Sequence, residues 1–572
     1  MKNSEKSGKL NRGRTLKSAA VGVLTFALCV ANTEARNIYI TPDADGTGDG
    51  SSWSSPMKIT GYFVTANVKN GDVVRLKAGS YTAQIAQMTF GNSITVSISG
   101  GYAGTDDTTL DAENPVSDID FANYPSSGGY APFLLKANAG YSVTFERLRL
   151  RRARNAVFYK TNNGGNLYLS DCVVVSNGWR NYSSSNSNGG RGIHTENGKL
   201  FMTNCVIAYN GMYSYPSSNP TSSYGDNGFG LYLKNTQAEM VGCKIYGNGS
   251  RINQEATDAA SQIIRSGGRG MAVYATGSTK LKAIDCDFVC NKSPMGFYNS
   301  ADQGRGKGTG GTVVLDAVTS TGSSFSNCAW IANMNVNDHT YGGVNNDFGG
   351  ALNVNASSPT SVVNIDNCTF AYNLTDSTKA SSGLDVWRGI VNVRNSIFVG
   401  NHKLASCVAG SDIMVRTGAV VNVSHTILPG TSDWNVKEET IGEDTGTVNL
   451  NDIVVGDALL ASETLASTNL IQTYSKKTGT TKITLTCLRY KVANIDEVLA
   501  FDVHPRSKAG RWTADGYVLD RVHSPAIDAG DPLAPFGAEP RPNGKRLNLG
   551  RYGGTEEASL TLVPPGTFLM VQ

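Results

Sequence analysis

Two short segments near the middle of the chain combine side chains that could carry out acid–base chemistry. One segment, Gly-Ile-His-Thr-Glu, ends at Glu196, and the other, Gly-Leu-Tyr-Leu-Lys, ends at Lys234. If each segment is a strand that buries its apolar positions, His194 and Glu196 face outward in one strand while Tyr232 and Lys234 face outward in the next. A base, a phenol and a cation would then share one surface.

These residue types suit the removal of a proton beside a sugar carboxylate, which needs a base for the proton and a cation to neutralise the carboxylate. Two arginines stand just before strands of this kind, so the candidate catalytic residues are Arg191, His194, Tyr232, Lys234 and Arg269. The alternative is structural, because Glu196 opposite Lys234 could be a simple ion pair worth roughly a few tenths of a kcal/mol. Later copies extend the same columns with Tyr274, Asp316, Asn353 and Asn355.

Polar loops of variable length separate these segments and carry aromatic and arginine side chains among many Asn and Ser residues. Aromatic rings stack on the apolar faces of sugars and Arg bonds their hydroxyl groups, although the same mixture also serves protein recognition. The candidate ligand-binding residues are Trp179, Arg180, Tyr182, Tyr213, Tyr215, Tyr224, Tyr298, Arg305 and Tyr341. The alternative is that these loops are irregular and that their rings pack on the strands beneath them.

A repeated motif indicates how such strands and loops are positioned. Cys preceded by Asp, Asn or Gly recurs with Asn five residues later, at Cys172 and Asn177, Cys205 and Asn210, Cys243 and Asn248, Cys286 and Asn291, Cys328 and Asn333, and Cys368 and Asn373; a seventh copy has Ser396 and Asn401. The strands between are short and alternating, without a helical period. Such a pattern predicts a β-solenoid whose loops leave successive coils at one corner and stack into a wall.

The two repeated residues have separate expected roles. Asn tolerates left-handed backbone geometry at a tight turn, and stacked Asn amides can bond along the solenoid axis. Cys is expected to be a small apolar plug in the core, as a free thiol; disulfides between neighbouring coils are the alternative. No short paired Cys motif is present, so we expect no zinc site.

Composition excludes several classes of protein. The 572 residues include 64 Gly, charged residues are 17%, and hydrophobic residues are 40%. Few charges argue against long surface helices, and the hydrophobic content is enough for a core. The formal net charge of +3 argues against a nucleic-acid partner bound through bulk charge.

The N-terminus has the pattern of an export signal. Basic residues precede an apolar stretch from Ala19 to Ala31, and Ala35 offers a cleavage site. That stretch is too short to cross a membrane core of roughly 30 Å. We therefore expect a protein that is secreted or on the cell surface, divided into a signal peptide (1–35), first coils (36–130), central coils with the Asn/Cys repeat (131–430), and C-terminal coils with a cap over the last coil (431–572).

Both ends of the remaining chain resemble one known family. Asn-Ile-Tyr-Ile-Thr-Pro-Asp at 37–43, with Gly-Asp-Val-Val at 71–74, resembles the first coil of bacterial β-helix proteins of the pectin-lyase-like superfamily. Ser-Pro-Ala-Ile-Asp-Ala-Gly-Asp-Pro at 524–532, with Asn-Leu-Gly-Arg-Tyr-Gly at 548–553, is similar to the closing segment of its choice-of-anchor Q group. The resemblance implies a right-handed parallel β-helix and export. It implies no reaction, because the superfamily contains lyases, hydrolases and adhesins.

Two further clusters have simple structural alternatives. Residues 147–151 alternate Arg with Leu, so a strand there would present either a basic stripe for an acidic glycan or an ordinary solvated face. Asp43, Asp45 and Asp49 lie in a Gly-rich loop that could hold calcium, but position 54 lacks the chelating Glu, which favours a polar turn.

The sequence thus predicts an all-β protein, a single-stranded right-handed parallel β-helix with a C-terminal cap, acting as a monomer. The function expected first is recognition of a polysaccharide or surface ligand by the stacked loops. One alternative is a polysaccharide lyase that cleaves an acidic glycan by β-elimination, preferred over a glycoside hydrolase because no closely paired acidic motif is present. The other is a structural surface component. Apart from the calcium alternative, we expect no metal or cofactor.

Overall fold

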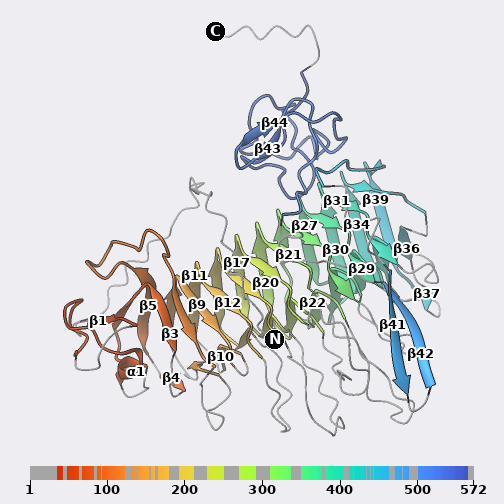
Figure 1. The fold of residues 1–572 in the computed structure, drawn as a ribbon. Coiled ribbons are helices and arrows are strands. Elements are labelled where there is room, and N and C mark those ends of the chain that lie inside the picture. Colours follow the sequence, from red (N-terminus) through yellow and green to blue (C-terminus); the bar gives the residue numbers. More distant parts are fainter. Residues whose placement is uncertain are drawn as a thin grey trace, which may run out of the picture.

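The computed structural model is a long solenoid of stacked coils with a smaller C-terminal lobe on its side (Figure 1). It describes residues 35–42, 48–63, 67–82, 87–91, 93–122, 131–135, 140–153, 156–161, 165–178, 192–211, 228–249, 269–291, 310–335, 349–375, 380–403, 411–416, 418–432, 435–438, 440–441, 444–462, 471–478, 481–488 and 500–563. The predicted signal peptide and most of the predicted loop wall lie outside these residues.

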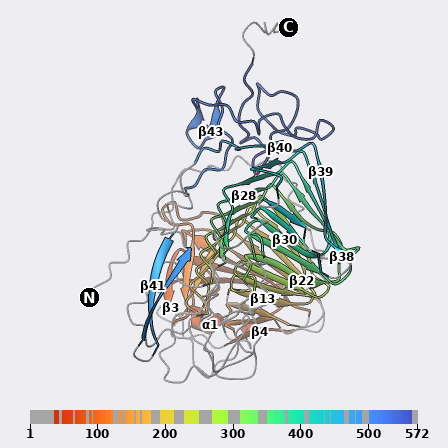
Figure 2. The same ribbon diagram turned by 90° about the vertical axis from the view of Figure 1, so that its right-hand side faces the viewer.

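Three parallel sheets form the sides of the solenoid, which Figure 2 views along the stack of coils. Sheet 1 contains β4 (Met88–Phe90), β7 (Phe133–Leu135), β10 (Phe158–Lys160), β13 (Ile193–Glu196), β16 (Leu231–Lys234), β19 (Val273–Thr276), β22 (Val313–Val318), β26 (Leu352–Ala356), the first half of β30 (Leu384–Arg394), β33 (Ile413–Val415) and β36 (Val436–Glu438).

Sheet 2 contains β1 (Asn37–Ile40), β2 (Val73–Lys77), β5 (Thr95–Tyr102), β8 (Tyr141–Glu146), β11 (Gly165–Ser170), β14 (Lys199–Thr203), β17 (Gln237–Val241), β20 (Lys280–Ile284), β23 (Ser323–Ser326), β27 (Val362–Asp366), the second half of β30, β34 (Ala419–Ser424) and β39 (Thr447–Asn451). Because β30 belongs to both, sheets 1 and 2 are continuous.

Sheet 3 contains β3 (Gly79–Thr82), β6 (Ser117–Asp120), β9 (Leu148–Arg151), β12 (Val173–Val175), β15 (Val206–Ala208), β18 (Lys244–Tyr246), β21 (Asp287–Val289), β24 (Ala329–Ile331), β28 (Thr369–Ala371), β31 (Ile397–Val399), β35 (Ile427–Leu428) and β40 (Val454–Val455). The smaller elements are α1 (Ile59–Tyr62), the parallel strands β25 (Met334–Asn335), β29 (Leu374–Thr375) and β32 (His402–Lys403), and the antiparallel pairs β37 (Thr440–Ile441) with β38 (Asp444–Thr445), β41 (Ile471–Thr478) with β42 (Thr481–Leu488), and β43 (Arg511–Thr513) with β44 (Gly516–Val518).

This architecture confirms the predicted all-β parallel β-helix. Each coil satisfies its backbone groups through the next, and alternate residues of each strand fill the interior with apolar side chains. Across the described residues, no helix has the length and apolarity that a membrane crossing would require.

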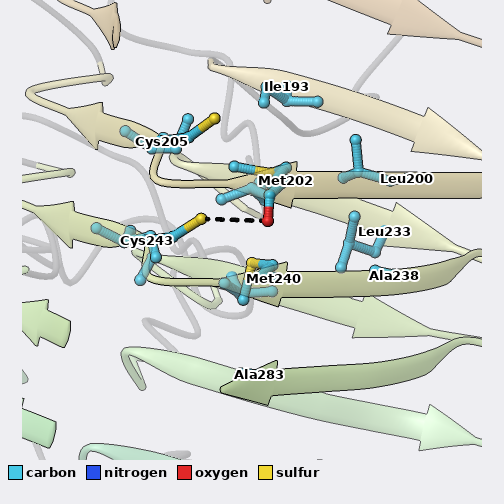
Figure 3. Close-up of a cluster of buried hydrophobic side chains, with 14 of the residues drawn as sticks. Ile193, Leu200, Met202, Cys205, Leu233, Ala238, Met240, Cys243 and Ala283 are labelled. Carbon is cyan, nitrogen blue, oxygen red and sulfur yellow. Dashed lines mark hydrogen bonds between the residues drawn. The ribbon is translucent and has the colours of Figure 1, made fainter. Parts of the chain in front are cut away.

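The repeated Cys side chains lie inside the solenoid as predicted. Seven cysteines among the described residues are free and buried. Figure 3 shows two of them stacked on neighbouring coils, where the Cys243 thiol donates to the Met202 carbonyl oxygen at 3.6 Å. Burial and the neighbouring thiol raise the pKa of the Cys286 thiol, so this column is apolar filling.

The repeated Asn residues form a continuous buried ladder, as the repeat predicted. Asn210, for example, donates from its backbone N–H and from Nδ2 to Oδ1 of Asn248 at 3.0 and 3.1 Å. The same pairing runs from Asn177 to Asn401, and Asn401 then donates to the buried carboxylate of Asp412 at 3.0 Å. Burial raises the pKa of Asp412 to about 6.

The expectation that these Asn residues adopt left-handed backbone geometry is wrong. Positive φ angles occur instead at the residue before each core Cys, such as Asn204 (52°) and Asn327 (52°), and at the residue before the ladder Asn, such as Tyr209 (53°). The ladder Asn has to point its amide into the solenoid, so the tight turns are made by its neighbours.

The structure describes part of each of the two further clusters. Leu148 and Leu150 are buried, and two of the arginines beside them bond within the solenoid: Arg151 donates to Asp118 at 2.9 Å and Arg147 to the Gly100 carbonyl at 3.0 Å. In the Gly-rich loop, Asp49 accepts hydrogen bonds from the Ser51 backbone N–H at 2.9 Å and from the Ser55 hydroxyl at 2.9 Å, which makes a polar turn. Asp43 and Asp45 lie outside the described residues.

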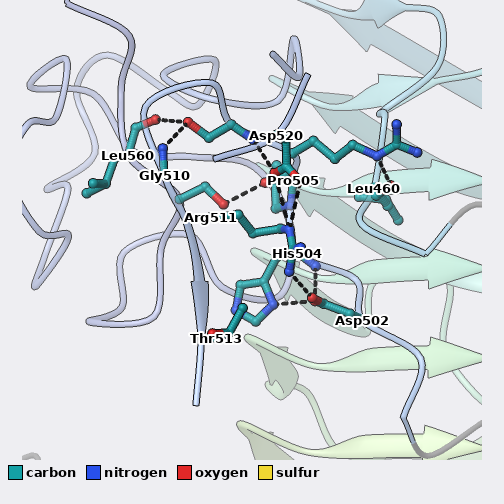
Figure 4. A network of polar contacts seen from close by, with 12 residues as sticks. Leu460, Asp502, His504, Pro505, Gly510, Arg511, Thr513, Asp520 and Leu560 are labelled. Carbon is teal, nitrogen blue, oxygen red and sulfur yellow. Dashed lines mark hydrogen bonds and ion pairs between the residues drawn. The ribbon is translucent and has the colours of Figure 1, made fainter. Parts of the chain in front are cut away.

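The C-terminal lobe, residues 501–563, packs on the flank of the solenoid. Arg551 forms ion pairs with Asp285 at 2.9 Å and Asp287 at 3.0 Å, and Leu549 packs with Ile331 and other apolar residues on the outside of sheet 3. Within the lobe, Figure 4 shows the polar network that fixes its fold, in which Asp502 binds His504 and Arg511.

The described residues of this lobe do not cover the last coil, and the predicted cap within 431–572 stays a prediction. Leu450 and Val455 of the last coil pair with the buried Val423 and Leu428 of the coil before, yet they are 39% and 60% exposed. From β24 onward, most outward side chains of sheet 3 are apolar and pack with residues of the lobe. Burial of this apolar surface favours packing of the lobe on the flank of the solenoid.

Candidate functional site

The strand register brings the predicted site residues together on the outer face of sheet 1. Tyr159, His194, Tyr232 and Tyr274 occupy one column of β10, β13, β16 and β19, and Glu196 pairs with Lys234 in the next outward column. Ile193 and Leu233 point into the core, as the alternation predicted.

His194 is not available as a base, contrary to expectation. Its ring lies between Tyr159 and Tyr232, with centroid distances of 4.4 and 4.5 Å, and the residue is fully buried. The spacing of neighbouring coils nearly equals the stacking distance of aromatic rings, so three consecutive rings in one column enclose the middle one. His194 Nε2 lies 3.2 Å from Glu196 Oε1, which fixes the ring further.

Tyr232 and Lys234 remain partly accessible. Burial raises the pKa of Tyr232 to about 12, so its phenol is neutral and can donate a hydrogen bond at pH 7. The Lys234 side chain is 45% exposed, with Nζ 3.8 Å from Glu196. The hydrogen bond with His194 holds the pKa of Glu196 below its ordinary value, so this carboxylate is charged. Lys234 thus presents a cation at the surface.

Arg269 forms an ion pair with Asp316 of the next coil. The same carboxylate accepts a hydrogen bond from the Tyr274 hydroxyl at 2.8 Å and one from Asn355 Nδ2 at 2.8 Å. Burial raises the pKa of Tyr274, which keeps its hydroxyl protonated as a donor. Side chains from successive coils are therefore joined in one polar cluster.

A second cluster, which the sequence analysis did not identify, surrounds Asp385 on β30. Asn353 Nδ2 and Trp387 Nε1 both donate to Asp385 Oδ2 at 3.0 Å, and Arg416 Nε donates to Oδ1 at 3.3 Å. Asp385 is fully buried, and desolvation raises its pKa. Asp385 continues the outward column of Asn353, so the strand register could have revealed it from the sequence. The coil of Asp385 lacks the repeated Cys and follows the previous copy of the repeat at a shorter spacing, which hid its alignment with Asn353.

The other predicted site residues have no described position. Arg191 and all nine candidate ligand-binding residues of the loops lie outside the described residues. Among the residues that are described, no group of His, Cys, Asp or Glu side chains has the arrangement of a metal site.

Comparison with known proteins gives remote likenesses. No family model matches the chain. Pectate lyase L of Dickeya chrysanthemi is 30% identical over 167 residues, which span 26% of this chain and only 38% of that protein. The crystal structure of pectate lyase Pel9A aligns with 90% of this chain and 96% of its own, with 14% identity and a TM-score of 0.37. The structure of DFA-IIIase from Arthrobacter chlorophenolicus A6 covers 67% of this chain and 83% of its own, with 12% identity and a TM-score of 0.33.

Proposed function

We propose that this protein binds a polysaccharide along the outer face of sheet 1. The observation that carries the proposal is the run of aromatic, amide and charged side chains that the register aligns there, from Tyr159 on β10 to Arg388 on β30, interrupted by Val314 on β22 and by Thr276 on β19. An extended polymer matches a surface built from coils that repeat along an axis, because each coil presents its outward side chains to successive sugars. Phenol, amide and ammonium groups bond hydroxyls, which suits sugars.

A binding measurement tests this proposal. Immobilised glycans or affinity gels of plant and bacterial polysaccharides should retain the wild-type protein. Tyr232→Ala and Lys234→Gln should each weaken retention about fivefold or more. Lys244→Gln is a matched control, because Lys244 lies in sheet 3. Equal retention of all variants would contradict the proposed face.

A polysaccharide lyase is the second candidate, favoured by the partial identity to pectate lyase L. Beta-elimination would need a base at the sugar C5 proton and a cation at the carboxylate. Burial of His194 leaves Lys234, paired with Glu196, as the exposed basic side chain of the predicted set on β13 and β16. Incubation with uronate polymers should then generate the ultraviolet absorbance of an unsaturated product, and Lys234→Ala should abolish it. Binding without product would exclude this candidate.

Export to the cell surface, the choice-of-anchor Q relationship and a monomeric state are part of the same proposal. Mass spectrometry of the mature N-terminus and light scattering of the purified protein test the first and the last. A protein that neither binds nor cleaves any glycan would favour a structural role.

A further inference from the structure

The strand β30 departs from the regular coil at the second polar cluster. Its pairing with β26 shifts register between Val354 and Asn355, so that Trp387 is an extra residue between the partners Val386 and Arg388. Such a bulge breaks the alternation of a strand and re-aims side chains, and bulges gather beside functional sites. Here it leaves two consecutive residues, Trp387 and Arg388, at the surface between the buried Val386 and Gly389.

Trp387 is held rigidly although it is only half-buried. Its Nε1 donates to Asp385 Oδ2 at 3.0 Å, and the Arg416 guanidinium lies 3.8 Å from the ring centroid. Asp385 and Arg416 are themselves buried and paired. An indole fixed at its edge and supported in this way loses little conformational entropy when a ligand contacts it.

The groups beside the indole have unused hydrogen-bonding capacity. Asn353 is fully buried and donates to Asp385, but its Oδ1 has no hydrogen-bond partner within the described part of the chain. Arg388 is exposed and, within the same residues, forms no hydrogen bond or ion pair. The Asn353 oxygen is buried and closed to a ligand, so the group that a ligand can reach beside the indole is the Arg388 guanidinium.

We propose that Trp387 and Arg388 form a sugar subsite in which one ring packs on the indole and an anionic substituent, a carboxylate or a sulfate, binds the Arg388 guanidinium. This inference rests on the proposed polysaccharide function and gives it a location and a ligand class. Aromatic rings pack on sugar faces, and the planar guanidinium binds carboxylate or sulfate through paired hydrogen bonds.

Affinity electrophoresis of the full chain tests the subsite with three probes: polygalacturonate, chondroitin sulfate and a neutral galactan. Trp387→Ala should weaken binding about tenfold, whereas Trp387→Phe, which keeps a ring over Arg416, should restore most of it. Arg388→Gln should weaken binding to the anionic probes about fivefold and reduce the salt dependence of binding. Preference for polygalacturonate or for chondroitin sulfate distinguishes the two anionic groups.

Arg394→Gln is the matched control, because Arg394 lies on the same strand but is already paired with Asp366 at 2.8 Å. It should bind within about twofold of wild type. If wild type binds a probe and both Trp387→Ala and Arg388→Gln bind equally well, the subsite is wrong and the wider function stands. If wild type binds the galactan as tightly as the anionic probes, the anionic class is wrong. If wild type binds none of the glycans tested, both proposals fail.

Discussion

Each Asn of the buried ladder makes several hydrogen bonds at once, which explains why the residue type recurs so strictly. Asn248 accepts from Asn210 through Oδ1 and donates from Nδ2 to Asn291 at 3.0 Å and to the Ile207 carbonyl at 2.9 Å. No other neutral side chain of this length both donates and accepts in this geometry. The turn at each coil therefore depends on a single amide.

Asn248→Ala should lower the free energy of unfolding by about 3 kcal/mol, because it leaves buried hydrogen-bond donors and an acceptor without partners. Chemical denaturation measures the loss. Asn392 is the matched control: its Nδ2 donates to Asn364 at 2.9 Å in a similar ladder on the half-exposed outer face of sheet 2. Asn392→Ala should cost less than about 1 kcal/mol, since water can replace its partners. Equal losses of unfolding free energy in the two variants would contradict the larger contribution of the buried ladder.

Lys160 is a second residue whose environment sets a measurable property. It points into the solenoid, is fully buried, and donates to the Asn197 carbonyl. Desolvation lowers its pKa from 10.5 to about 8. Above pH 10.5 the amine is neutral in both folded and unfolded chains. As pH falls from 10.5 to 8 the unfolded chain gains the proton first, so stability decreases; below pH 8 the loss is constant.

Lys160→Met should therefore raise the free energy of unfolding at pH 7 by about 3 kcal/mol and remove the pH dependence between 8 and 10.5. Denaturation at pH 7 and at pH 10 measures both effects. Lys199→Met, at an exposed position of β14, should change neither. A Lys160→Met variant that keeps the wild-type pH dependence would contradict burial of the charge as its source.

At the scale of elements, β30 joins two sheets because Gly389 turns the strand without ending it. Its φ of +112° is a conformation that side chains disfavour, and a Cβ there would lie 3.1 Å from the Ala356 Cβ and from the Ser361 carbonyl oxygen. The corner follows directly after Trp387 and Arg388, so it also sets where those side chains emerge.

Gly389→Ala should lower the free energy of unfolding by about 2–3 kcal/mol and weaken glycan binding as well. Gly418→Ala is the control. Gly418 also has a positive φ, +71°, but beyond its chain neighbours no atom of the described residues lies within 4 Å of the point that a Cβ would occupy. That variant should cost only about 1 kcal/mol of backbone strain and leave binding unchanged. Thermal unfolding and affinity electrophoresis together check the pair.

At the scale of the whole molecule, long-range contacts attach the C-terminal lobe to coils that lie far earlier in the chain. Arg551 is 11% exposed at its side chain and pairs with two carboxylates on and beside β21. Its backbone N–H also binds Thr369 at 3.0 Å, so one residue connects the lobe to several coils.

Arg551→Met should loosen this attachment and speed hydrogen exchange in residues 501–563 about tenfold or more, since a buried charged network is lost. Arg546→Met is the matched control, because Arg546 donates to the Ala529 and Gly530 carbonyls within the lobe itself. Exchange measured by mass spectrometry should be unchanged in the control. Unchanged exchange in both variants would show that apolar packing alone holds the lobe.

The sequence by itself determined the solenoid, its core columns and the register of its outward columns. The constant offset from Cys to Asn fixes how each coil lies on the next, and strand alternation then assigns His194, Tyr232 and Glu196 to their columns. These properties are repeated in every coil, so a local pattern is enough to predict them.

Only the tertiary structure decided which of these side chains are accessible and what completes the site. His194 is enclosed by rings of two other coils, Trp387 emerges because one strand gains a residue relative to its partner, and the C-terminal lobe finds an apolar flank far back along the chain. Alternation within a strand distinguishes inward from outward positions. It cannot say what covers an outward side chain, because that depends on atoms from distant coils.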